Sequence, residues 1–348
     1  MTSRSQSVPT QVLLAETNDV RPFARLLKGI GLKHNAVMTV SDAGFEVTVE
    51  EVKTLFAIAW IPTNLFQTFE YTPLPSGEPA CFEISLDALL QCLNIFGNAS
   101  TSATVGPVLP AATRNRRRWA GEGEGGEGDL DDAAEWRPRG KERRTGMRMS
   151  WMGPGSPLSM LLQDDARGPM TNCELTVLEP EDLVNQPFNS DDCVLYLIMK
   201  SEWFRDALLD LPPSSTRITL VATPRDQPVP PEQPNATGSS NARHKQRADV
   251  GNFSIQAEGD FGKTELDYPN DKDVMDRFDC QEQVSFSYHS AHIAMLSRAL
   301  NASIKICLQI ESSGYLCVQI MMPVSENLPT GNHSGILEFK MNPLDEEE

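Results

Sequence analysis

The chain has 348 residues and a formal net charge of −18, with 40% hydrophobic and 22% charged residues. This length suits two domains, and the apolar content is enough for a substantial core. A surface this acidic repels nucleic acid, which excludes a uniformly basic DNA-binding domain but not a protein that gathers its cations on one face. The seven cysteines form no CxxC pair. Such a scattered set favours a reducing compartment over a disulfide framework.

The first hundred residues are dense in strand and helix patterns. In the run 82–97, Phe82 and Ile84 alternate with polar residues, as in a half-buried strand. Ser85 is suited to cap the helix that follows, because its hydroxyl can accept a hydrogen bond from an unpaired backbone N–H. The run 55–61 is almost wholly apolar, which predicts a strand buried on both faces. Further strands are predicted over 12–17, 36–40, 45–50 and 66–71. Helices are predicted over 20–28 and after Ser85, where Gly97 can take the left-handed turn that ends the second helix.

Two stretches of biased composition interrupt these patterns. Residues 98–144 contain GEGEGGEGDLDD between basic clusters, and residues 224–249 are rich in Pro, Asn and Ser. Neither stretch can bury enough apolar surface to offset chain entropy, so we expect both to be disordered insertions in loops. We expect disorder also in residues 1–10, and residues 345–348 form an acidic tail.

The strand–helix unit recurs in the rest of the chain. Strands over 147–151, 158–163 and 173–177 are followed by a polar connector over 178–192. The second half then has strands over 194–200, 217–222, 253–257, 263–267, 284–288, 304–310, 315–322 and 336–341, and helices over 202–211 and 291–301. This recurrence predicts four units paired into two similar halves. The alternative is four unrelated strand–helix connections in an ordinary α+β protein. In both cases the predicted class is α+β, with antiparallel sheets and helices on one side.

The first helix carries the clearest charge pattern. Arg21, Arg25 and Lys28 are spaced so that they fall within about 60° of arc, and the apolar residues occupy a separate stripe. On a very acidic chain, such a basic face indicates a surface that contacts phosphates. The alternative is a solvated helix face, on which Lys28 is favourable near the negative end of the helix dipole.

The other helices add weaker candidates, which are Arg205, His292 and Arg298. Acidic residues accompany them, so their positive character is smaller. His289 and His292 are three residues apart and could chelate a metal, but no third ligand is apparent in the sequence. We interpret the two histidines as polar residues at a helix start, and we predict no metal site.

Arginines cluster on both sides of the acidic insertion, at Arg114, Arg116, Arg117, Arg118, Arg143 and Arg144. Nuclear import receptors read clusters of this kind, but charge that keeps a long loop soluble explains them equally well. The sequence shows no carboxylate cluster for two-metal nuclease chemistry, no phosphate-binding glycine loop and no nucleophile elbow. An enzymatic function is therefore disfavoured.

Several long runs resemble one protein family. In the first half they are MTVSDAGFEVTVEEVKTLFAIAWIPTNLFQTFEY and FEISLDALLQCLNIFG, and in the second LIMKSEWFRDALLDL, GKTELDYPNDKDVMDRFDC and YLCVQIMM. In this order they resemble the Rad-one subunits of the heterotrimeric checkpoint sliding clamp. The resemblance covers most of residues 11–344 and fails in the two insertions.

The resemblance implies a PCNA-like DNA clamp with domains over 11–177 and 193–344, each built from two βαβββ units. Helices would line a central hole, sheets would form the outside, and 178–192 would join the domains. It implies a non-catalytic nuclear subunit whose ring is completed by Rad-nine type and Hus-one type subunits. A clamp loader would place this ring around duplex DNA at damage sites, where it recruits checkpoint signalling and repair factors. No cofactor is implied.

The resemblance also implies sites. The residues expected to face DNA are Arg21, Arg25, Lys28, Arg205, His292 and Arg298. The groove under the connector, expected to hold a partner peptide, involves Leu183, Val184, Pro187 and Pro323. Some members of the family have been credited with 3′→5′ exonuclease activity, so a metal-dependent DNA exonuclease is the alternative function. The sequence offers no carboxylate cluster to support it.

Overall fold

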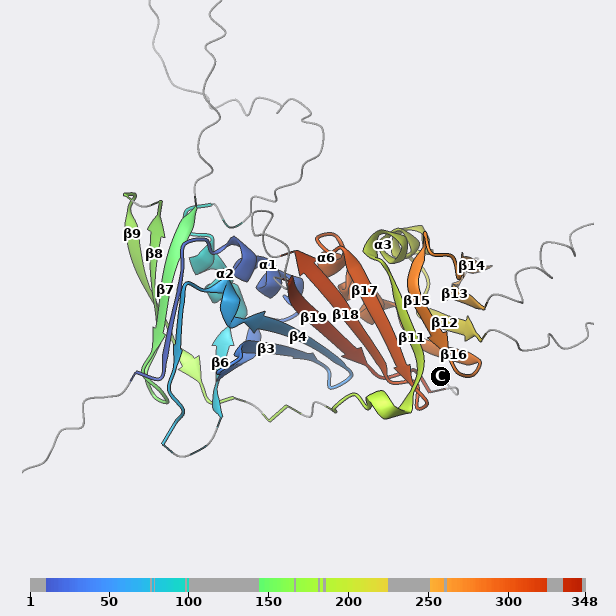
Figure 1. The fold of residues 1–348 in the computed structure, drawn as a ribbon, viewed down its shortest axis with the longest axis horizontal. Coiled ribbons are helices and arrows are strands. Elements are labelled where there is room, and N and C mark those ends of the chain that lie inside the picture. Colours follow the sequence, from blue (N-terminus) through green and yellow to red (C-terminus); the bar gives the residue numbers. More distant parts are fainter. Residues whose placement is uncertain are drawn as a thin grey trace, which may run out of the picture.

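The computed structural model describes residues 11–75, 77, 79–97, 99, 144–165, 167–180, 182–183, 186–224, 251–259, 262–323 and 334–345. Residues 1–10, residues 346–348 and nearly all of both insertions lie outside the described residues. The described chain forms three sheets, in which every strand pair is antiparallel, and a few short helices (Figure 1). The predicted α+β class is confirmed.

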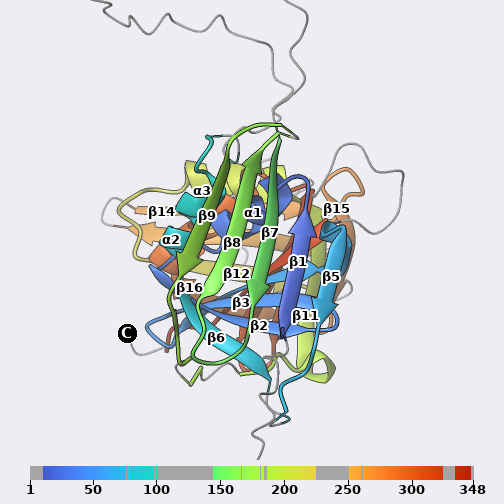
Figure 2. The same cartoon turned by 90° about the vertical axis from the view of Figure 1, so that its left-hand side faces the viewer.

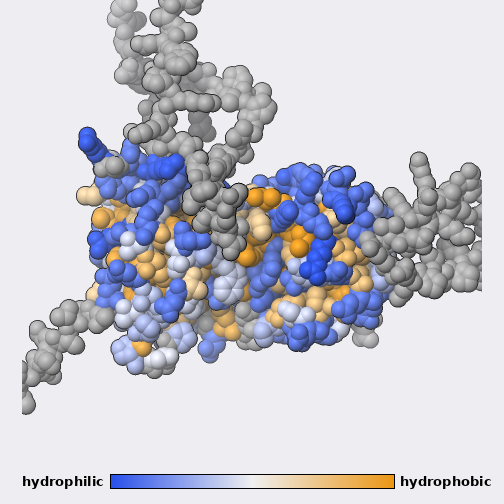
Figure 3. Space-filling view, in the orientation of Figure 1, coloured by the Kyte–Doolittle hydropathy of each residue, from blue (hydrophilic) through white to orange (hydrophobic). Residues whose placement is uncertain are grey.

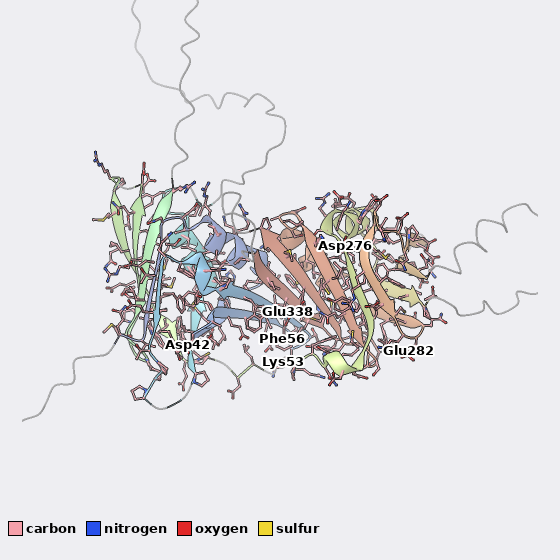
Figure 4. All side chains as sticks on the ribbon, in the orientation of Figure 1. Asp42, Lys53, Phe56, Asp276, Glu282 and Glu338 are labelled. Atoms are coloured by element: carbon pink, nitrogen blue, oxygen red, sulfur yellow. The ribbon has the colours of Figure 1, made fainter. Side chains whose placement is uncertain are left out.

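The largest sheet has ten strands and runs through both halves of the molecule. Its order is β10-β6-β2-β3-β4-β19-β18-β17-β11-β15. The strands are β2 (Asn35–Ser41), β3 (Gly44–Glu51), β4 (Leu55–Pro62), β6 (Ala80–Ser85), β10 (Val177–Leu178), β11 (Cys193–Lys200), β15 (Met275–Cys280), β17 (Lys305–Glu311), β18 (Leu316–Pro323) and β19 (Ser334–Met341). The halves meet where β4 pairs with β19, and Figure 4 shows Phe56 and Glu338 near one another at this junction.

A smaller sheet closes each end. In front in Figure 2 is the five-stranded sheet β5-β1-β7-β8-β9, and the four-stranded sheet β14-β13-β12-β16 lies at the opposite end. The strands are β1 (Leu13–Thr17), β5 (Thr68–Tyr71), β7 (Thr145–Trp151), β8 (Leu158–Asp164), β9 (Met170–Leu175), β12 (Arg217–Thr223), β13 (Asn252–Gly259), β14 (Gly262–Pro269) and β16 (Val284–His289).

The helices gather on one side of the sheets. They are α1 (Arg21–Gly29), α2 (Leu86–Leu93), α3 (Ser201–Asp210), α5 (Ser290–Met295) and α6 (Ser297–Leu300), and single 3₁₀ turns lie at η1 (Thr63–Leu65) and η3 (Ser190–Asp192). In Figure 1, α2, α1, α6 and α3 follow one another along the upper side, and the described residues just before β11, which include η3, lie on the lower side. No helix among the described residues is long and apolar enough to span a membrane.

The two halves have the same design. From β1 to β9 and from β11 to β19, the elements follow in the same order, with α1 matching α3 and α2 matching α5 and α6. The pairing order also matches, since β5-β1-β7-β8-β9 corresponds to β15-β11-β17-β18-β19 and β6-β2-β3-β4 to β16-β12-β13-β14. This internal repeat confirms the prediction of two similar halves, each with two βαβββ units. Each half also has one strand outside these units, β5 in the first half and β15 in the second.

Most predicted elements are present. The predicted cap is confirmed, since Ser85 Oγ accepts the N–H of Ala88 at 3.3 Å at the start of α2. Some elements differ from the prediction. The single helix predicted over 291–301 is instead two helices, because the N–H of Leu296 bonds to the carbonyl of Ile293 in a tighter turn. The run 55–61 is not buried on both faces throughout, because Trp60 is 41% exposed. The short strands β15 and β10 were not predicted.

Packing fixes α1 at the junction between the halves. Phe23 inserts into an aromatic cluster, with ring centroids 6.0 Å from Phe45 and 5.8 Å from Phe66. At the other end of the helix a Cβ on Gly29 would collide with Leu337 of β19, so glycine allows the helix to cross this strand closely. The exposed face of α1 is thereby positioned over the seam of the ten-stranded sheet.

Candidate nucleic-acid interface

Four of the residues predicted to face DNA line one hollow on the helical side. Arg21, Arg25 and Lys28 come from α1, and Arg298 comes from α6 in the other half. The hollow measures about 520 Å³, and α1 contacts α6 beside it. We call it the cationic hollow. One carboxylate, that of Asp87, also lines this concave surface, but the four cations outnumber it and favour anionic oxygens.

Three of these cations are held by backbone carbonyl groups. Arg25 Nη1 donates to the carbonyl of Pro323 at 2.8 Å, Lys28 Nζ to that of Ala99 at 2.9 Å, and Arg298 Nη1 to that of Gly31 at 2.8 Å. A carbonyl group has no net charge, so these bonds orient the cations without neutralising them. The sequence explains the positions on α1, but not these three acceptors, which tertiary packing supplies.

The surroundings of Lys28 change the pKa of its ammonium group. Burial lowers the pKa of its ammonium group, and the neighbouring charge of Arg25 lowers it further. Both effects penalise the charged form of the lysine. An anion in the hollow would oppose the repulsion from Arg25, so binding of a phosphate is expected to raise the pKa of Lys28 again.

Arg21 differs because a carboxylate balances its charge. Its Nη2 lies 2.7 Å and its Nε 2.9 Å from the two oxygens of Asp19. Arg144 Nε lies 3.9 Å from the same carboxylate. Asp19 also accepts the backbone N–H of Arg21 at 3.0 Å, at the positive end of α1. Two arginines therefore share one negative charge at this end of the hollow.

Arg205 is not part of the cationic hollow. It pairs with Asp206, whose Oδ1 lies 2.8 Å from Nη2, and it lines a separate hollow between α3 and the helices α5 and α6. The exposed residues of α3 include Glu202, Asp206 and Asp210. The exposed side of α3 is therefore acidic, in line with the weaker positive character expected from the acidic residues beside Arg205 in the sequence.

His292 also lies apart from the four cations. Burial lowers the pKa of its imidazole, and His289, with its ring centroid 5.2 Å away, lowers it further. The side chain is therefore mostly neutral near pH 7 and adds little attraction for phosphate. The described residues contain no group of three or more His, Cys, Asp or Glu that could hold a metal ion.

The structure separates the residues of the predicted peptide groove. The connector contacts the beginning of β18, where Tyr315 Oη donates to the carbonyl of Gln186 at 3.3 Å and stacks on Phe188. Pro323 ends the same strand, and at about 3.3 Å per residue it lies roughly 23 Å from Leu316. Pro323 is therefore not in a groove under the connector. Leu183 and Pro187 belong to the connector, and Val184 lies outside the described residues.

A different apolar surface was not predicted. Trp60 pairs with Ile336, and Ile336 pairs with Met321, so the three residues form a row across β4, β19 and β18. They are 41%, 41% and 42% exposed and line a hollow of about 480 Å³. Figure 3 shows apolar and polar residues intermixed on the face of the molecule seen in Figure 1. We call it the apolar row. Sequence alone did not reveal it, because the pairing of β4 with β19 joins residues far apart in the chain.

Of the arginines considered for nuclear import, only Arg144 lies in the part of the chain that the structure describes, where it approaches Asp19. Arg114, Arg116, Arg117, Arg118 and Arg143 lie outside the described residues.

Comparison with known proteins agrees with this fold. A family model described as "Repair protein Rad1/Rec1/Rad17" matches residues 12–322. The human cell cycle checkpoint protein RAD1 is 26% identical, over 89% of this chain and 86% of its own length. The DNA damage checkpoint control protein rad1 of Schizosaccharomyces pombe is 25% identical, over 95% of this chain and 86% of its own length. The DNA repair exonuclease REC1 of Mycosarcoma maydis is 22% identical, over 89% and 88% respectively.

Among solved structures, the crystal structure of Proliferating Cellular Nuclear Antigen (PCNA) from Entamoeba histolytica matches with a TM-score of 0.61. The match covers 97% of this chain and all of the PCNA chain, at 12% sequence identity. At this identity the match shows a shared fold. The family match extends over most of the chain, and the sheets and helices are arranged as in that clamp. The chain therefore belongs to the Rad1/Rec1/Rad17 family of repair proteins and is a checkpoint clamp subunit with a PCNA-like fold.

Proposed function

We propose that this chain forms part of a ring that encircles duplex DNA and holds it through phosphate contacts without reading its bases. The cationic hollow carries this proposal, because an otherwise acidic chain of net charge −18 gathers four cations from both halves at one place on its helical side. Contacts to phosphates position a protein on DNA but convey no sequence information. Such a surface suits a protein that must travel along any sequence.

The internal repeat supports assembly into a ring. Within the chain β4 pairs with β19, and the counterparts of these strands in the other half are β14 and β9. Both counterparts are edge strands, with one side unpaired among the residues that the structure describes. An unpaired edge is a template for another strand. Edge strands such as β14 and β9 could therefore pair with a neighbouring subunit as β4 pairs with β19 within the chain, and this pairing would extend the ring. Partners of the Rad-nine and Hus-one types, loaded by a clamp loader, fit this scheme.

The apolar row supports recruitment of other proteins. Trp60, Ile336 and Met321 offer large side chains over the junction of the halves, away from both edge strands and from the helical side. Aromatic and methionine side chains are typical anchors in protein interfaces. We assign this surface to a short apolar segment of a repair or signalling protein. Substitution of Trp60 by Asp should abolish capture of such a segment and leave ring assembly unchanged.

The experiment that tests the main proposal reverses charge in the cationic hollow. Rings containing Arg25→Glu, Lys28→Glu and Arg298→Glu should assemble normally but be lost from circular duplex DNA. A control with the same change of charge is Arg148→Glu, Arg277→Glu and Lys305→Glu, at half-exposed positions on strands. Retention of the first variant equal to that of the control would exclude the hollow as the DNA contact.

A metal-dependent 3′→5′ exonuclease is the second candidate, because the relative from Mycosarcoma maydis is named a DNA repair exonuclease. The checkpoint names of the human and fission yeast relatives favour a subunit without catalysis. Purified chain incubated with Mg²⁺ and a 3′-labelled duplex separates the two functions. Degradation that copurifies with the chain and is lost on changing one carboxylate would establish the enzyme. Action in the nucleus follows from the checkpoint function, with the arginine clusters as the proposed import signal.

A further inference from the structure

A second hollow, of about 500 Å³, lies on the helical side of the second half, between α3 and the helices α5 and α6. We call it the α3 groove. Its size is typical of sites that bind a ligand group. Asn301 lines both the α3 groove and the cationic hollow, so the two hollows adjoin. Most of its wall is apolar and includes Leu208, Leu209, Leu211, Pro212, Ala291 and Leu300.

Two side chains in the α3 groove are in unfavourable surroundings: one is apolar but exposed, and the other is polar but buried without a hydrogen bond. Leu209 is 75% exposed, although it borders an apolar wall. Ser215 is 7% exposed, and its Oγ is buried without any hydrogen-bond partner. Buried hydroxyl groups are normally hydrogen-bonded. An occupant that covers Leu209 and places a donor near Ser215 would satisfy both.

The charge around the α3 groove argues against DNA as the occupant. Glu202, Asp206 and Asp210 follow one another at every fourth position, so they lie within about 80° of arc on the exposed side of α3. The single cation of this helix, Arg205, is paired with Asp206. Such a rim repels phosphates and attracts a cationic segment.

We propose that the α3 groove is the docking site of this chain's own segment 114–119, RNRRRW. Its four arginines complement the carboxylates of α3, and its tryptophan supplies an apolar group with one N–H donor. In the groove, the side chain of Trp119 would cover Leu209. Ser215 Oγ has almost no exposed surface, so the Ser215 side chain would turn toward the groove to accept the indole N–H, a partner that a buried tryptophan normally finds.

The segment lies outside the described residues, but its attachment point favours docking. Ala99, the last described residue before it, lines the cationic hollow that adjoins the α3 groove. The fifteen residues from 99 to 114 can span up to about 50 Å, which is ample for adjoining hollows. A segment tethered this closely acts at a high effective concentration, so even a weak interaction is populated.

Hydrogen exchange of the full chain tests the proposal. One variant changes Arg114, Arg116, Arg117 and Arg118 to Gln and Trp119 to Ala. The control changes Arg137, Arg139, Lys141 and Arg143 to Gln, which removes the same charge from the same insertion. We expect the backbone amides of residues 209–216 to exchange at least threefold faster in the first variant and at the native rate in the control. Equal rates in all three proteins, or equal acceleration in both variants, would overturn the proposal.

Cross-linking provides an independent measurement. Arg116, Arg117 and Arg118 are changed to Lys, which keeps the charge and supplies amines that a zero-length carbodiimide couples to carboxylates in contact. The expected products, in dilute protein, link these positions to Glu202, Asp206 or Asp210 of the same chain. Adding Leu209→Asp should remove them. Links only between different chains would assign the groove to a second copy, and links only to other acids, or none, would exclude the segment as its occupant.

Discussion

Arg298 Nη1 donates a hydrogen bond of 2.8 Å to the carbonyl oxygen of Gly31, which joins α6 of the second half to the end of α1 in the first. The same guanidinium lines the cationic hollow. One residue therefore connects the halves and contributes to the proposed DNA contact.

Substitution of Arg298 by Ala should weaken both functions. The lost hydrogen bond should lower the free energy of unfolding by about 1 kcal/mol. The ring should also dissociate faster from DNA, and the salt dependence of binding should fall by about one phosphate contact. Substitution by Lys should restore part of the salt dependence. Urea unfolding and retention at several salt concentrations measure the two effects, and an unchanged salt slope in the Ala variant would contradict the second.

Gly29 should not tolerate a side chain. A methyl group there would collide with Leu337 of β19, so Gly29→Ala should lower the free energy of unfolding by about 1–3 kcal/mol. The double variant Gly29→Ala, Leu337→Ala removes the obstacle and should be more stable than the sum of the single effects predicts. Additive losses in the double-mutant cycle would show that close packing of α1 on β19 is not the cause.

The sequence predicted local features far better than contacts between distant segments. The basic face of α1 and the cap at Ser85 follow from residues a few positions apart, for which helix geometry alone is decisive. The carbonyl partners of Arg25 and Arg298, and the row of Trp60 with Ile336, depend on the pairing of β4 with β19. Nothing in the local pattern specifies that pairing. Pro323 was misassigned for the same reason, because the end of β18 that meets the connector is set by the sheet.

His292 should make stability depend on pH below neutrality. Burial and the neighbouring His289 lower the pKa of the folded imidazole below its usual 6.5, so between the two values the unfolded chain binds more protons. Stability from this group is fully present above pH 6.5 and is lost as the pH falls through that window. The variant His292→Gln should therefore lose less stability than the native chain between pH 7 and pH 5.5. If the melting temperature fell equally with pH in the native chain and in the variant across this range, His292 would not be the group responsible.

Removal of the charge of Asp19 should strengthen DNA binding, the opposite of most substitutions at a binding site. Asp19 now balances Arg21 and lies near Arg144. Asn at this position keeps an oxygen that can accept the backbone N–H of Arg21, so the start of α1 should persist and the stability loss should stay within about 1 kcal/mol. Loss of this negative charge would make the electrostatic potential of the cationic hollow more positive. We expect longer retention on DNA and a steeper salt dependence, by about one phosphate contact.

Asp206→Asn is the matched control for that experiment. It likewise removes a carboxylate from an arginine, since Asp206 pairs with Arg205 at 2.8 Å, but it does so outside the cationic hollow. If long-range charge alone governed retention, both variants would bind DNA more tightly by similar factors. If the hollow makes the contact, Asp19→Asn should have the larger effect on the salt slope, because only its arginine lies within reach of the same phosphates as Arg25 and Lys28.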